Sequence, residues 1–204
     1  MYTDEFYYHI DDWNWKAVKV EGKPPSSRTY HSAVAVGEDK IVYIGGNDSS
    51  KSFNDVHVLQ KVEKKEGEAA WSWFCPSIVG LPPQARTGHS ATVLNDGNIF
   101  IFGGWDPQRD DATAPTSVFN DAFLLDTKAW EWQPATYSDE GQVDTSLRGR
   151  VGHGAVTDSE GRVHVFGGQT GSEQRLKDVC TLTISQAPDE KTKVTPSVLE
   201  TNAV

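Results

Sequence analysis

An all-β fold built from a repeated four-stranded unit is predicted by three features of the sequence. A short motif recurs three times, an apolar run ending in Gly-Gly follows each copy, and turn residues separate the strand-like runs. No window of ten or more residues shows the periodicity of an amphipathic helix. The repeat period is 58 residues between positions 28 and 86 and 64 between positions 86 and 150, which indicates a repeat architecture.

The first half of the repeat begins with an Arg and a His three residues apart. It reads Arg-Thr-Tyr-His-Ser-Ala, then Arg-Thr-Gly-His-Ser-Ala, then Arg-Val-Gly-His-Gly-Ala, and Gly-Gly starts 17 residues after each Arg. The apolar run before Gly-Gly lacks alternation, which is typical of a strand buried on both faces. The residues of this half that we expect to be architectural are Arg28, His31, Gly45, Gly46, Arg86, His89, Gly103, Gly104, Arg150, His153, Gly167 and Gly168.

The second half of the repeat carries an Asn-Asp or Lys-Asp pair, an alternating strand and then Trp-x-Trp. Alternation with a period of two places both Trp rings on one face of a strand. The N-terminus carries this half alone, with Trp13 and Trp15 as its pair, and the third copy has no Trp where one is expected, near residue 187. The architectural residues expected in this half are Asp55, Trp73, Asp121, Trp132 and Asp178.

Four short antiparallel strands at this period fit the blades of a β-propeller. Together, Arg-x-x-His-Ser-Ala, Gly-Gly, Asn-Asp-Val and Trp-x-Trp resemble kelch repeats of the host-cell-factor and Rab-effector type, over residues 4–184. The resemblance implies a β-propeller of about three and a half four-stranded blades, two of them complete, with half a blade at the N-terminal end and an incomplete blade of three strands at the C-terminal end. The expected divisions are the second half of a blade at 1–20, complete blades at 21–80 and 81–135, an incomplete three-stranded blade at 136–186 and a polar tail at 187–204.

The number of blades predicts that the arc is incomplete by itself. Kelch propellers that this sequence resembles close with about five to seven blades. Each blade needs a neighbour to bury its face, so we expect either further blades of a larger propeller or self-association of two copies into one ring.

Charge and composition restrict the classes of function. The 204 residues include 19 basic and 29 acidic side chains, and this net charge of −10 disfavours a general nucleic-acid binder. No apolar run is long enough to span a membrane, and the first 30 residues lack the pattern of a secretory signal. The two cysteines, Cys75 and Cys180, are expected to be buried thiols. The expected location is cytoplasmic, with the nucleus as the alternative.

Patterns for catalysis or metal binding are weak. The three repeated histidines occupy one slot in successive blades, where we expect them to hydrogen-bond at the start of a strand while the Arg pairs with acidic or carbonyl groups. His9, Asp11 and Asp12 match no metal-ligand spacing, no Lys-Ser/Thr follows the Gly-Gly pairs, and no Gly-x-Ser-x-Gly elbow occurs. We therefore predict no enzyme activity, no metal and no cofactor for this chain.

Loop lengths predict where a partner binds. In a four-stranded blade, the loops after the second strand and between blades lie on one face. The loop after the second strand grows in the middle unit, because the sequence distance from the second Gly to the Asp rises from 9 (positions 46 to 55) to 17 (positions 104 to 121). Loops on a rigid scaffold commonly carry function, and Trp and Arg are enriched at interface hot spots. The predicted partner-binding residues are Trp105, Asp106, Gln108, Arg109, Asp110, Asn47, Lys51, Gln169 and Arg175.

The function predicted from these features is a non-catalytic module or scaffold for protein–protein interaction. The partner is expected to be a protein, and neither nucleic acid nor a membrane. Two alternatives remain open, which are a regulatory kelch segment of a larger enzyme of the kinase or phosphatase type and a metal-dependent kelch enzyme.

Overall fold

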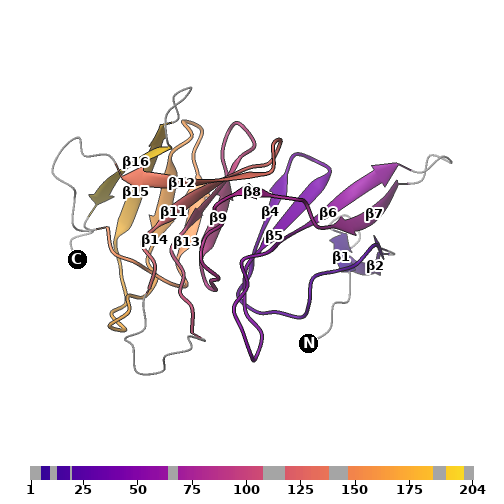
Figure 1. The fold of residues 1–204 in the computed structure, drawn as a ribbon, viewed down its shortest axis with the longest axis horizontal. Coiled ribbons are helices and arrows are strands. Elements are labelled where there is room, and N and C mark those ends of the chain that lie inside the picture. The colour runs from indigo at the N-terminus through magenta and orange to yellow at the C-terminus, as the bar shows by residue number, and fades with distance from the viewer. Residues whose placement is uncertain are drawn as a thin grey trace.

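The computed structural model describes residues 6–9, 13–18, 20–63, 69–107, 118–137, 147–185 and 192–199. Within these ranges every regular element is a β-strand, from β1 (Phe6–His9) to β16 (Lys193–Leu199), as Figure 1 shows. None of the described residues belongs to a helix that could cross a membrane. The all-β prediction is therefore confirmed.

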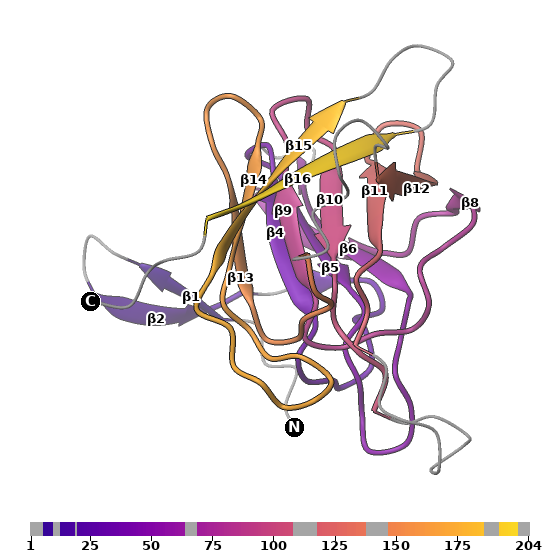
Figure 2. The same cartoon turned by 90° about the vertical axis from the view of Figure 1, so that its left-hand side faces the viewer.

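Three four-stranded antiparallel blades stand side by side along an arc (Figure 1). Their first strands lie next to one another along one side of this arc (Figure 2). The first blade consists of β4 (Ser32–Val36), β5 (Lys40–Ile44), β6 (Val56–Glu63) and β7 (Ala69–Phe74). The second consists of β9 (Ser90–Val93), β10 (Ile99–Phe102), β11 (Ala122–Asp126) and β12 (Glu131–Tyr137). The third consists of β13 (Gly154–Thr157), β14 (Val163–Phe166), β15 (Val179–Ser185) and β16.

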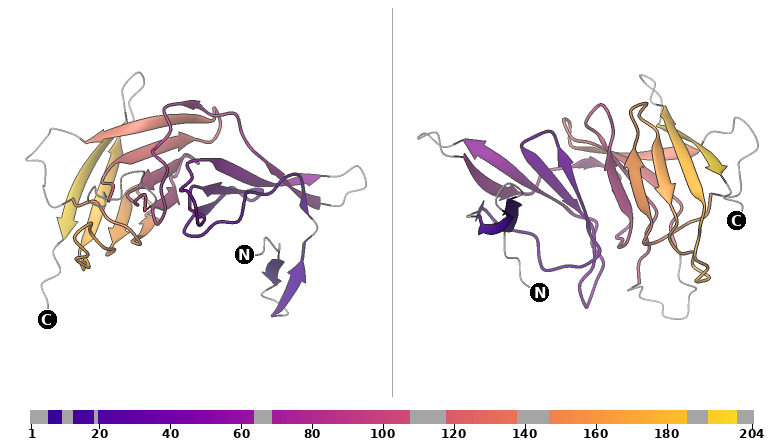
Figure 3. Two further views of the ribbon diagram at one scale, coloured as in Figure 1. Left: turned by 60° about the horizontal axis from the view of Figure 1, so that its bottom comes forward. Right: turned by 180° about the vertical axis from the view of Figure 1, so that it is seen from behind.

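A separate hairpin precedes the first blade. It consists of β1 and β2 (Asn14–Ala17), which pair antiparallel with Phe6 opposite Ala17. These are the third and fourth strands of a blade, as the isolated second half of the repeat predicts. The hairpin lies at the N-terminal end of the arc (Figure 3).

The C-terminal segment differs from the predicted polar tail. β16 lies inside residues 187–204 and pairs antiparallel with β15 along its whole length, so the third blade has four strands and not three. The arc thus holds three complete blades and one half blade at its N-terminal end. The strand was missed because Pro196 stands opposite Leu182, in the slot that a Trp fills opposite Leu59 and Leu125 in the other two blades. The fully buried Val194 anchors β16 instead.

Each blade also receives a short parallel strand from the connection that precedes it. β3 (Val20–Glu21) pairs with β7, β8 (Val79–Gly80) pairs with β12, and the end of β12 pairs with β16. Gly80 has φ 84°, and a β-carbon there would lie 2.4 Å from the carbonyl oxygen of Trp132, so the close approach of the two backbones requires glycine.

Two hydrophobic cores fill the spaces between the three blades. Ile99 and Ile101 of β10 face the first blade, and Phe100 and Phe102 face the third. All four residues are buried, which confirms the prediction that this apolar run is a strand buried on both faces. The middle blade therefore contributes side chains to both cores.

The two cysteines differ in environment. Cys180 is fully buried in the core between the second and third blades. Cys75 is exposed, because it follows the last residue of β7, so the prediction of a buried thiol is wrong at this position.

Candidate functional site

A buried arginine holds the start of the loop after the second strand in each blade. The guanidinium of Arg86, which is 1% exposed, donates hydrogen bonds to both carboxylate oxygens of Asp121 at 2.7 and 3.0 Å. It also donates to the carbonyl oxygen of Gly103 at 2.9 Å. These contacts explain why the Arg, the Asp and the first Gly recur together. The equivalent trios are Arg28, Asp55 and Gly45 in the first blade and Arg150, Asp178 and Gly167 in the third.

The carboxylate of the first trio is held in its ionised form. Burial acts to raise the pKa of Asp55, but hydrogen bonds from His57 and Arg28 outweigh it and hold the pKa well below its ordinary value. An ionised partner for the buried guanidinium is therefore present at neutral pH.

In the second and third blades, the repeated histidine packs between its own blade and the blade before it. A β-carbon on Gly104 would lie 2.8 Å from Cβ of His89, and one on Gly45 of the preceding blade would lie 2.8 Å from its Cε1. In the third blade, Nε2 of His153 hydrogen-bonds the Ser90 hydroxyl of the preceding blade at 2.8 Å. Burial and the neighbouring Arg lower the pKa of His89 to about 3 and that of His153 to about 4. Both rings are neutral at pH 7, as packed joints between blades require.

These histidines do not assemble into a metal site. Within the part of the chain that the structure describes, no three His, Cys, Asp or Glu side chains are grouped to hold a metal ion. His89 and His153 each serve one joint between blades instead, whereas His31 of the first blade is exposed.

The loops after the second strands meet the connections between blades on one face, which we call the loop face. Backbone hydrogen bonds join the two sets, for example from the Arg86 amide to the Phe53 carbonyl at 3.0 Å and from the Thr87 amide to the Trp105 carbonyl at 2.8 Å. The loop face comprises residues 26–31, 45–55, 84–89, 103–107, 118–121, 147–153 and 167–178.

Three predicted partner-binding residues occupy the same position of the loop face in three successive blades. Asn47, Trp105 and Gln169 each follow the Gly-Gly pair and each pair with the residue after the repeated Arg. The amide oxygen of Asn47 accepts a hydrogen bond from the Thr87 hydroxyl at 2.9 Å, so Asn47 joins the first two blades. Trp105 is half-buried and also pairs with Val118 at the end of the expanded loop.

Of the other predicted residues, three lie on the loop face and three lie outside the described residues. Asp106 accepts a hydrogen bond from the Ser52 hydroxyl at 2.6 Å and so ties the first blade to the second. Lys51 and Arg175 are exposed on the loop face. The remaining three lie outside the described residues and are Gln108, Arg109 and Asp110.

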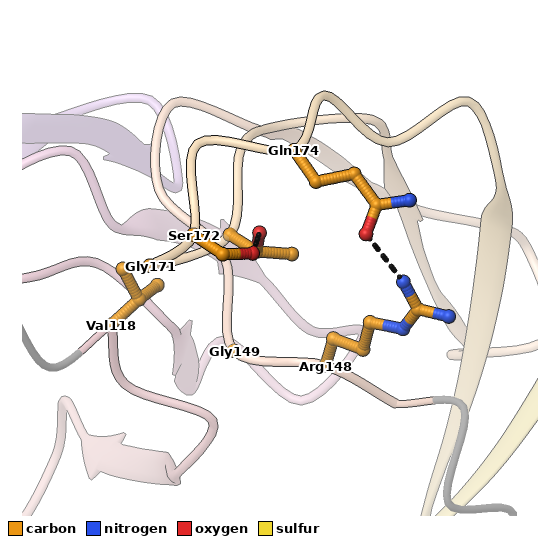
Figure 4. Close-up of a pocket in the computed structure, with 7 residues that line it drawn as sticks. Val118, Arg148, Gly149, Gly171, Ser172 and Gln174 are labelled. Carbon is orange, nitrogen blue, oxygen red and sulfur yellow. Dashed lines mark hydrogen bonds between the residues drawn. The ribbon is translucent and has the colours of Figure 1, made fainter.

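A pocket of about 330 Å³ opens on the loop face between the second and third blades (Figure 4). The Arg148 guanidinium donates a hydrogen bond to the side-chain oxygen of Gln174 at 2.9 Å, and the Thr170 and Ser172 hydroxyls lie 3.0 Å apart. Among the described residues, no acidic side chain lines the pocket. Its lining residues are Val118, Arg148, Gly149, Thr170, Gly171, Ser172 and Gln174.

Sequence reasoning missed this pocket although its neighbours were predicted. Gln169 and Arg175 flank the turn that forms one wall, and Arg148 precedes the third repeated Arg by two residues. The available signal was the polar Thr-Gly-Ser turn after the third Gly-Gly, which only the folded loop brings opposite Arg148.

The repeats and the blades agree with the comparison to known families, since the family model described as the KLHDC2/KLHL20/DRC7 Kelch-repeats domain matches residues 1–143. The chain belongs to the kelch-repeat family. One relative is acyl-CoA-binding domain-containing protein 5 of Arabidopsis thaliana, 31% identical over 160 residues, which cover 78% of this chain and 22% of the relative. Another is the Rab9 effector protein with kelch motifs of Xenopus laevis, 34% identical over 113 residues, which cover 55% of this chain and 27% of the relative. The kelch chain thus spans about a quarter of the length of these relatives.

Solved structures share the kelch fold at low sequence identity. YjhT has a TM-score of 0.61 at 17% identity, and the match covers 93% of this chain and 51% of that one. A chain from the structure of RAG in complex with one melted and one unmelted RSS has a TM-score of 0.68 at 16% identity, covering 96% and 59%. At these sequence identities, the two structural similarities show a shared propeller fold and nothing about function.

Proposed function

We propose that this kelch chain is a non-catalytic protein–protein interaction module or scaffold that binds a protein partner on its loop face, centred on the pocket at Arg148. Kelch repeats generally mediate protein–protein interaction. The observation that carries the proposal is that the expanded loop and the pocket coincide, since Val118 ends that loop and lines the pocket. The proposal includes a cytoplasmic or nuclear location.

The pocket offers groups that suit a peptide main chain or a polar side chain. Arg148 is exposed and its guanidinium has further N–H donors beyond the one bonded to Gln174. The hydroxyls of Thr170 and Ser172 can donate or accept. The buried trios at the base of the loops hold this arrangement in place, and a pre-ordered site loses less entropy when a partner binds.

A substitution at the pocket tests the proposal. Proteins captured by the wild-type chain are identified, and the affinity of the most abundant one is measured for Arg148→Ala. We expect affinity to fall about tenfold because an interface Arg is a frequent hot spot, with the melting temperature unchanged.

Arg162→Ala is the matched control, because it removes a surface arginine in the hairpin between β13 and β14, outside the loop face. Ion pairs near the surface, such as the partly exposed Arg162–Asp158 pair, contribute little to stability. Equal affinity of wild type and Arg148→Ala would contradict the proposal.

A regulatory role within a larger enzyme is the second candidate. It is favoured by the small share of the relatives' length that the kelch chain covers, 22% and 27%. Sequencing the gene that encodes this chain beyond both ends tests it, because this role requires a catalytic domain in the same reading frame.

A further inference from the structure

The short strand β8 forms the outer edge of the second blade, on the opposite side of its sheet from β9 (Figure 2). The Val79 amide donates to the Trp130 carbonyl at 3.0 Å, so the backbone groups of Val79 face β12. Because these groups alternate in direction along a strand, those of Ile78 and Gly80 face away from the sheet. Within the described chain, the outward groups of Ile78 and Gly80 have no hydrogen-bond partner, so the blade ends in an open edge.

The side chains along this edge are apolar on both faces of the strand. Ile78 packs against the core between the first and second blades. Val79 and Leu81 lie on the other face, because side chains alternate along a strand, and they are 58% and 70% exposed. The edge is therefore anchored on one face and presents exposed apolar side chains on the other.

The first blade has an equivalent edge strand, which serves as an internal comparison. β3 pairs with β7 as β8 pairs with β12. Gly22 has φ 83°, and a β-carbon there would lie 2.3 Å from the Trp73 carbonyl oxygen, which matches the geometry of Gly80 against Trp132. The two edges can therefore be compared residue by residue.

The two edges differ in the side chains beside this glycine. The first blade has Glu21 and Lys23, both exposed, where the second has Val79 and Leu81. Charged residues on an edge strand, Lys above all, prevent it from pairing with another chain. The backbone geometry thus accepts charge at these positions, and β8 lacks the protection that β3 carries.

A bound segment has to match both the backbone and the side chains of the β8 edge. Ile78 and Gly80 offer two N–H donors and two carbonyl acceptors, which an extended segment can pair with as an added strand. Side chains of that segment beside Val79 and Leu81 have to be apolar, since a charge placed there loses water without gaining a partner. Pro82 has no N–H, so the paired stretch is limited to about three to five residues.

We propose that the open edge of β8 binds a short, extended, apolar segment of a partner protein, which adds as a further strand to the second blade. This inference goes beyond the proposed function, because no residue of this edge belongs to the loop face.

The test selects peptides from a phage-displayed library of random decapeptides against the immobilised wild-type chain. The affinity of each selected peptide is then measured for the double variant Val79→Glu/Leu81→Lys, which gives β8 the charged residues of β3. We expect a group of apolar peptides to bind this variant at least about tenfold more weakly, and to bind Arg148→Ala as they bind wild type. The melting temperature of the double variant should stay within about 2 °C of wild type, because both side chains are exposed.

Hydrogen exchange distinguishes strand addition from contact of side chains alone. A saturating amount of such a peptide should slow exchange of the Ile78 and Gly80 amides about tenfold or more. The Val79 amide already donates to Trp130, so its exchange should change less. Val156→Glu is the control variant, because it places a charge at another exposed valine, in β13 of the third blade, and it should bind the peptides as wild type does.

Binding, exchange and melting together decide the outcome. Equal binding of all selected peptides by the double variant, or unchanged exchange of the Ile78 and Gly80 amides, would overturn the inference. A melting temperature more than about 5 °C lower in the double variant would overturn it as well, because the apolar side chains would then serve the fold. Self-association of the wild-type chain that the double variant loses, measured by sedimentation velocity, would assign the edge to a second copy instead. If the selected peptides respond to Arg148→Ala and none responds to the double variant, the proposed function stands and this inference alone fails.

Discussion

Arg86 shows how a charged residue can recur inside each blade. Removing a guanidinium from water is costly, and the cost is offset only where its donors are satisfied by good geometry. Asp121 and Gly103 supply three acceptors, and the Phe119 ring lies 4.4 Å from the centre of the guanidinium. The exposed edge of Asp121 keeps the carboxylate partly hydrated, so only the arginine is fully desolvated.

Asp121→Asn should therefore destabilise the fold by about 3 kcal/mol, since it leaves a buried charge without its counter-ion. Urea unfolding monitored by tryptophan fluorescence measures the change. Glu38→Gln, an exposed substitution of the same kind, should leave the free energy of unfolding within about 0.5 kcal/mol of wild type. A loss below about 1 kcal/mol for Asp121→Asn, the size of a surface pair, would contradict the burial argument.

The buried histidines at the joints between blades lead us to predict that the fold loses stability in mild acid. The pKa of His153 is lowered to about 4 in the folded chain, so the unfolded chain binds more protons between pH 6.5 and 4. Stability is complete above pH 6.5 and falls as the pH drops, by about 2–3 kcal/mol for this residue at pH 4.5. Carboxylates with a lowered pKa, such as Asp158 with an unfolded value of 3.8, lose most of their contribution below pH 4.5.

Urea unfolding at pH 7 and at pH 4.5 measures this loss. His153→Asn removes the titrating group and should shrink the difference between the two pH values by about 2 kcal/mol. An unchanged difference would mean that the ring is protonated in the folded chain.

Residues that recur could be predicted from the sequence, and residues defined by backbone geometry could not. Arg86 and His89 stand out because identical neighbours repeat at fixed spacing. The left-handed φ of Tyr30 follows only from its equivalence to Gly88 in the folded chain. The exposure of Cys75 depends on where β7 ends, which its apolar neighbours do not reveal.

At the scale of secondary-structure elements, the sequence predicts the strands that have a strong hydrophobic pattern and does not predict those that lack one. β10 was predicted because four consecutive apolar residues precede Gly-Gly. β16 lacks the Trp pair, and β3 and β8 have two residues each, too short for any periodicity. The signal for β3 and β8 was a different repeat, Gly-x-Pro-Pro, which starts at Gly22 and at Gly80, six residues before the repeated Arg in each case.

The parallel pairing of β8 with β12 gives a prediction with an internal control. Gly80→Ala places a β-carbon 2.4 Å from the Trp132 carbonyl oxygen, whereas Gly97→Ala meets nothing within 4 Å. The two glycines have φ 84° and 89°, so both substitutions carry the same backbone strain of about 1–2 kcal/mol. We expect Gly80→Ala to cost about 2 kcal/mol more than Gly97→Ala because it also separates β8 from β12.

The comparison is made by urea unfolding of the two variants alongside wild type. Amide hydrogen exchange of Val79 should accelerate only in Gly80→Ala, because this amide donates to the Trp130 carbonyl at 3.0 Å. Equal costs for the two alanines would show that the close approach relaxes without loss of the strand pairing.

At the scale of the molecule, the arc has an unburied end. Phe166 of the third blade is 43% exposed, whereas the equivalent Ile44 and Phe102 are 1% and 0% exposed because a following blade covers them. On the same outward face, His164 hydrogen-bonds Thr181 at 2.9 Å where the middle blade has Phe100 opposite Leu124. A covering blade or a second copy therefore remains the prediction for this face.

Phe166→Ser should reduce concentration-dependent association of the chain, measured by sedimentation velocity, because it removes exposed apolar surface. Its free energy of unfolding should change by less than about 1 kcal/mol, whereas Phe102→Ser should cost about 3–5 kcal/mol as a core substitution. A strictly monomeric wild-type chain at high concentration would contradict the first expectation.

The short parallel strands bear on the order in which the blades can form while the chain is being synthesised. The fifth strand of each blade comes from residues that precede the blade, since β3 precedes β4, β8 precedes β9, and Thr136 precedes β13. A chain leaving the ribosome therefore holds every strand of a blade as soon as the last strand of that blade emerges. No blade waits for its outer edge on residues still to be synthesised, so these edges can form in the order of translation.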